Sequence, residues 1–165
     1  MPDEIDGELI GPERPMLEDY LRWQRRTLLA ICAGLSAEQL ASRPLPSTNL
    51  SLLGLVRHMT KVERIWFRIR AAAEQIEPVF DPELGKDYDF EAIDPSDAPA
   101  AIEAYIAECR AAESAAAGLD FERPVPTRDG EWSLRGVHVH MIGEYARHNG
   151  HADMLRQAID GVTGR

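Results

Sequence analysis

Residues 133–159 have the sequence SLRGVHVHMIGEYARHNGHADMLRQAI. They predict one long helix, because Ser133 is a natural N-cap and Gly161 and Gly164 stop a helix. Helical residues advance roughly 100° each, so a single stripe of this helix collects four polar side chains: His140, Glu144, His148 and His151. Burying imidazole and carboxylate groups of a largely apolar helix costs free energy unless they bind a partner such as a metal. We therefore expect this helix to carry the functional site.

Three further long helices are predicted, over residues 15–33, 51–73 and 97–117, and each has an apolar side. The spacing of Ser36 and Gln39 is that of a capping box and predicts one short helical turn after the first of them. Four long helices joined by loops of unequal length predict an all-α fold. The expected architecture is a four-helix bundle with a long crossover connection.

The segments between the helices differ in character. Residues 74–98 are acidic and rich in proline, and we expect them to form the crossover, either as a functional rim or as a solvated linker. Residues 119–131 are predicted to be a loop, and no segment shows the two-residue period of a strand. Residues 1–12 are expected to be a disordered or loosely attached arm, and residues 13–165 a single domain.

Composition excludes several classes of function. A net charge of −10 and a pI near 4.9 argue against binding to nucleic acid or to anionic membrane surfaces. No apolar run reaches the length of a membrane span, and the first residues lack the apolar core of a signal peptide. Cys32 and Cys109 occupy core-like helical positions, as free thiols do in a reducing compartment. We therefore expect a cytoplasmic protein.

The histidines suggest a metal site between two helices. His58 lies between Leu55 and Val62 on the second long helix, so we expect it to face the core, whereas His138 is expected at the rim. Side chains four residues apart on one helix can share a ligand, and a facing helix can supply another donor. The predicted ligands of a divalent metal (Zn, or else Ni or Fe) are His58, Glu144 and His148.

Other polar and aromatic residues have plainer interpretations. His151 could replace a ligand, and His140 could orient Glu144 or contact a substrate; packed or surface histidines are the alternative to any metal site. The side chains expected to be exposed helix charges rather than catalytic groups are Glu63, Arg64 and Arg147. The tryptophans expected in the core rather than as substrate platforms are Trp23, Trp66 and Trp132.

Two stretches resemble the DinB-like superfamily: residues 58–67, HMTKVERIWF, and residues 144–156, EYARHNGHADMLR. The resemblance extends from about residue 15 to residue 164 and is nearest to the branch often labelled mini-circle protein. It implies a four-helix bundle whose metal is held by three side chains, commonly three histidines. Glu144 stands where the middle histidine usually lies, and the mycothiol-dependent maleylpyruvate isomerase branch is similar in using a His-Glu-His set.

The resemblance also implies a chemistry. The superfamily includes S-transferases that use mycothiol, bacillithiol or glutathione, so it suggests a metal-dependent enzyme that joins a low-molecular-weight thiol to a small electrophile. Arg64 or Arg147 would then hold anionic or sugar groups of the thiol. The alternatives are a thiol-dependent isomerase of a small diacid and a non-catalytic metal-binding stress protein. Small bundles of this type often pair, so a homodimer is a further expectation.

Overall fold

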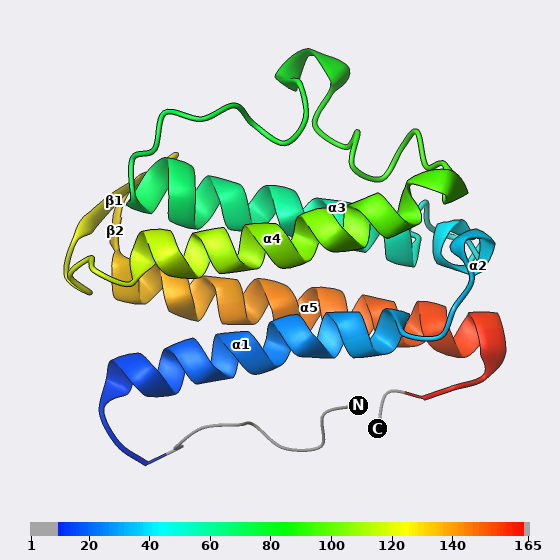
Figure 1. The fold of residues 1–165 in the computed structure, drawn as a ribbon, viewed down its shortest axis with the longest axis horizontal. Helices are drawn as coiled ribbons and strands as arrows, with labels where there is room; N and C mark the ends of the chain where they lie inside the picture. The colour runs from blue at the N-terminus through cyan, green and yellow to red at the C-terminus, as the bar shows by residue number, and fades with distance from the viewer. Residues whose placement is uncertain (1–9, 164–165) are drawn as a thin grey trace.

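A computed structural model describes residues 10–163 and confirms the all-α bundle with four long helical segments lying side by side (Figure 1). These segments are α1 (Glu13–Cys32), α3 (Leu52–Glu63) with its continuation η1 (Arg64–Ala71), α4 (Ala98–Ala116) and α5 (Leu134–Asp160). The predicted arm over residues 1–12 lies largely outside the described residues. Within residues 10–163, no helix has both the length and the apolar character that a membrane span needs.

The connections set the direction of each helix. In Figure 1, α1 and α5 run the same way, and α3 and α4 run the opposite way. A long crossover after η1, which contains the short helices η2 (Pro82–Leu84) and η3 (Pro95–Asp97), therefore returns the chain along the bundle before α4 begins. The structure confirms the predicted crossover connection. It also places α1 against α5 and α3 against α4 as the most extensive helix pairs.

The long helices begin within two residues of their predicted starts. The hydroxyl oxygens of Ser51 and Ser133 accept hydrogen bonds from the backbone N–H of Gly54 (3.0 Å) and Gly136 (3.1 Å). Ser36 opens α2 (Ala37–Ala41) through the predicted capping box. One departure lies in η1, which is a π-helix. Its wider turns belong to the segment predicted as the end of one continuous α-helix.

The prediction of a strandless loop before the last helix is wrong. β1 (Pro124–Thr127) and β2 (Gly130–Ser133) pair in antiparallel register, with Val125 opposite Trp132. Each strand has four residues, and prolines occupy two positions of β1, so the alternating pattern is too short and too interrupted to recognise. Val125 is fully buried, so the hairpin closes one end of the bundle.

A polar network crosses the centre of the bundle. Glu63 is fully buried and forms a bidentate ion pair with Arg25, with Nε–Oε1 at 2.6 Å and Nη2–Oε2 at 2.8 Å. The hydroxyl of Tyr145 donates to Glu63 Oε1 (2.7 Å), and that of Tyr105 donates to Tyr145 (2.9 Å). These residues come from α1, α3, α4 and α5, so the network joins all four long helices. The expectation that Glu63 is an exposed charge is wrong, because this residue faces the bundle interior.

Removing the carboxylate of this network should be strongly destabilising. We predict that Glu63→Ala lowers the free energy of unfolding by about 3–5 kcal/mol, because it leaves the buried guanidinium of Arg25 unpaired. Urea denaturation followed by circular dichroism measures the change. Glu113→Ala is the matched control, since Glu113 pairs with the same arginine but is half-exposed, and it should cost less than about 1 kcal/mol. Equal losses for the two variants would contradict the prediction.

Candidate metal centre

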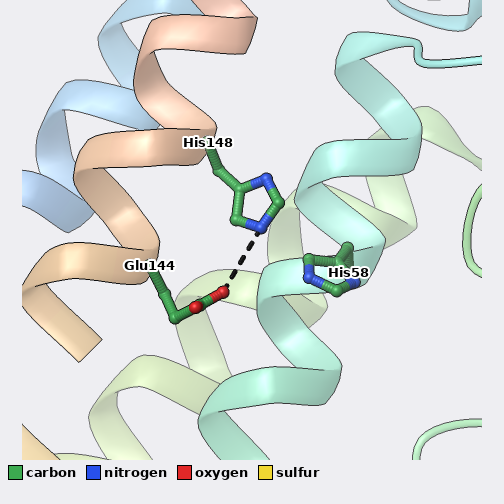
Figure 2. Close-up of side chains that lie close together, drawn as sticks. All are labelled: His58, Glu144 and His148. Atoms are coloured by element: carbon green, nitrogen blue, oxygen red, sulfur yellow. Dashed lines mark ion pairs between the residues drawn. The ribbon is translucent and has the colours of Figure 1, made fainter. Parts of the chain in front are cut away.

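The three side chains predicted as metal ligands meet in the seam between α3 and α5 (Figure 2). One ligand atom from each of His58, Glu144 and His148 lies within 4.8 Å of the others. His148 Nε2 is 3.6 Å from Glu144 Oε2, and the centroids of the two imidazole rings are 4.7 Å apart. Metal–ligand bonds are about 2 Å long, so small side-chain rotations would bring the three atoms around one ion.

Asp89, which the sequence did not single out, fixes the orientation of His58. Its Oδ2 lies 2.6 Å from His58 Nδ1 and 2.7 Å from Lys61 Nζ. Burial raises the pKa of Asp89, but the hydrogen bonds from His58 and Lys61 outweigh this effect, so the pKa of Asp89 lies below its ordinary value. An ionised carboxylate only accepts hydrogen bonds, so His58 donates through Nδ1, and Nε2 is the ring nitrogen that the neutral imidazole would offer to a metal.

The crossover holds Asp89 in place by packing on α3. The ring of Phe90 stacks on His58 with centroids 4.9 Å apart, and Arg57 donates to the carbonyl oxygens of Ala92 (3.0 Å) and Tyr88 (3.3 Å). Gly54 allows this approach, because a Cβ there would lie 3.2 Å from Phe90 Cδ1. This part of the crossover is therefore an ordered wall beside His58 and not a solvated linker.

His148 is held in the form that binds metals. It is buried, and burial together with the proximity of His58 lowers the pKa of His148 from its ordinary value of 6.5 to about 4. The imidazole is therefore neutral at pH 7, as a metal ligand must be. Its Nε2 faces Glu144 in Figure 2, whereas its Nδ1 is buried without a hydrogen-bond partner among the residues that the structure describes.

His140, His151 and Arg147 lie close to the cluster, whereas Arg64 is held by another residue. His140 Nε2 is 4.0 Å from Glu144 Oε1, and the ring of His151 is 5.6 Å from that of His148. Arg147 lies 3.8 Å from Glu144 Oε1, and its side chain is 66% exposed. Arg64 is instead engaged by Glu108, with Nη2–Oε2 at 2.5 Å.

His138 does not lie at the rim, so that expectation is wrong. The residue is buried, its Nδ1 lies 3.0 Å from the carbonyl oxygen of Leu134, and its ring packs between Phe67 and Phe121. Helical periodicity placed it away from the stripe correctly. The same periodicity cannot show that Phe121, in the segment before the hairpin, packs on His138 and covers this side of α5.

The low pKa of His148 makes stability depend on pH in the metal-free protein. Between pH 6.5 and about 4 the unfolded chain binds a proton at this residue that the folded chain does not. We predict that the free energy of unfolding falls as the pH is lowered through this window, and that the imidazole signals of His148 titrate near pH 4. NMR titration after metal removal by a chelator measures this directly. A midpoint near 6.5 would contradict the prediction.

Comparison with known proteins identifies the family. The family described as Mycothiol-S-transferase matches residues 16–161, which is nearly the whole chain. This match supports the DinB-like assignment drawn from the sequence. No curated protein matches the chain. On the strength of the family match, the chain belongs to the mycothiol-S-transferase family.

Proposed function

We propose that the protein is a metal-dependent S-transferase that joins a low-molecular-weight thiol of the mycothiol type to a small electrophile. The observation that carries this proposal is the convergence of His58, Glu144 and His148, whose ligand atoms lie within 4.8 Å of one another in a chain of this family. In the reaction the S–H bond of the thiol breaks and its proton passes to solvent. The sulfur then forms a bond to the electrophilic carbon, and the leaving group on that carbon, a halide for a halogenated electrophile, departs with the electron pair of its bond.

The donor set fits a divalent cation. Two imidazoles and one carboxylate are ligands that Zn prefers, and Ni or Fe accept the same set. Three protein ligands leave coordination positions for a small molecule, which is typical of catalytic sites. When bound, such a metal lowers the pKa of a coordinated thiol, so that the nucleophilic thiolate exists at neutral pH.

The chain's own residues prepare this site. Asp89 accepts the Nδ1 hydrogen bond that orients His58, and burial keeps His148 neutral, so His148 does not need to lose a proton before binding. Of the two arginines proposed as contacts for the thiol cosubstrate, Arg147 is the better placed, because it is exposed and lies beside Glu144. The guanidinium of Arg64 is already engaged by Glu108.

Thiol consumption in the presence of metal tests the function. We predict that zinc-loaded protein consumes mycothiol in a one-to-one ratio with a fluorogenic halogenated electrophile, and that His58→Ala and His148→Ala each lose most of the bound metal and the activity. Metal analysis and thiol titration measure the two effects, with His151→Ala as the matched histidine control. A chain that binds no divalent metal, or that returns the thiol unchanged, would contradict the proposal.

The carboxylate behind His58 should tune metal affinity. We predict that Asp89→Asn weakens zinc binding about 10–100-fold, because the neutral amide no longer holds the Nδ1–H group and the orientation of the histidine as the carboxylate does. Competition with a chromophoric chelator gives the affinity. Asp87→Asn, a change at an exposed residue of the same crossover, should leave it unaltered. If the two variants bind zinc equally, Asp89 has no such role.

A further inference from the structure

Three aromatic rings from three different elements gather beside the metal cluster. They belong to Trp66 of η1, Trp132 of β2 and His140 of α5, and we refer to them as the aromatic shelf. The indoles of Trp66 and Trp132 stack with centroids 5.1 Å apart and an interplanar angle of 13°. The centroid of the His140 ring lies 4.6 Å from that of Trp66 and 5.1 Å from that of Trp132. Trp132 is 38% exposed, so the expectation of a core tryptophan is wrong for this residue.

The shelf is continuous with the cluster. His140 belongs to the same stripe of α5 as Glu144, one helical turn away, and its Nε2 is 4.0 Å from Glu144 Oε1. One turn of helix rises about 5.4 Å. A molecule whose reacting atom lies at the cluster therefore reaches the shelf if it extends several bonds beyond that atom.

Hydrogen-bond donors border the shelf. The guanidinium of Arg70 lies 4.4 Å from the centroid of the Trp66 ring, and within residues 10–163 it has neither an ion pair nor a hydrogen bond. Arg147, on the other side of Glu144 along α5, is largely exposed. His140 has no hydrogen bond to any described residue. The surface thus combines aromatic rings with donors that make no hydrogen bond to a residue within 10–163. Arg147 and His140 are, however, within ion-pair distance of Glu144 (3.8 and 4.0 Å).

We propose that the aromatic shelf binds the sugar portion of the thiol cosubstrate, an inference that rests on the proposed function. A sugar ring presents an apolar face of C–H groups that packs on an indole, and hydroxyl oxygens that accept hydrogen bonds from guanidinium groups. Mycothiol carries its cysteine on a glucosamine joined to inositol, so such a ring follows the sulfur by several bonds. The shelf therefore selects a sugar-bearing thiol over a simple one.

Steady-state kinetics with two thiols tests this selectivity. We expect Trp132→Ala to raise the KM for mycothiol about tenfold, while kcat/KM with N-acetylcysteine, which has no sugar, changes less than about twofold. Trp132→Phe keeps a ring at the shelf and should show an intermediate KM. Trp23→Phe, at a tryptophan that packs on Tyr20 of α1, is the control and should behave as the unmodified protein.

A binding measurement separates this inference from the proposed function. The metal-free protein is titrated with glucosaminyl-inositol, the sulfur-free part of mycothiol, while the heat of binding is recorded by isothermal titration calorimetry. A response that persists in Trp23→Phe and is lost in Trp132→Ala supports the shelf even if no thiol is turned over. The inference is overturned by a response unaffected by Trp132→Ala, by equal kinetic losses for both thiols, or by a loss that follows the electrophile instead of the thiol.

Discussion

The rest of the structure depends on the bidentate ion pair between Arg25 and Glu63. A carboxylate removed from water needs partners for its oxygens, and Glu63 obtains them from Arg25 and from Tyr145. Burial lowers the pKa of Arg25, but the charge and hydrogen bonds of Glu63 outweigh this, so the pKa of Arg25 lies well above its ordinary value and the guanidinium remains charged. Because Tyr145 follows Glu144 directly, the same contact fixes the rotation of α5 that turns Glu144 and His148 toward His58.

Three groups of residues lie along the seam between α3 and α5. His58, Glu144 and His148 form the candidate metal centre, the crossover supplies Asp89 and Phe90 behind His58, and the aromatic shelf includes His140, one turn away from Glu144 on α5. Each group comes from a different region of the chain. Only the packing of the bundle brings them together, and the buried network that links Glu63 of α3 to Tyr145 of α5 joins the same two helices.

Patterns within short stretches of sequence predicted the features that depend only on neighbouring residues, namely the helices, their N-caps and the polar stripe of α5. The 3.6-residue period identified the long helices, Ser51 and Ser133 marked two of their starts, and the stripe on the last helix led to Glu144 and His148. The features that were missed are set by contacts between distant segments. Asp89 is one of several acidic residues in the crossover, and nothing in its neighbours distinguishes it before the loop folds onto α3.

The pairing of the first long helix with the last has a consequence for how the chain acquires its structure. α1 packs chiefly on α5, and more than a hundred positions of the chain separate their contacting residues, as in the hydrogen bond from Asn149 to Gln24. While the chain emerges from the ribosome, the apolar side of α1 has no permanent cover until residues 134–160 are synthesised. The contact between the first and last long helices is therefore made late, and until it forms the nascent chain presents the apolar side of α1 to aggregation or to capture by chaperones.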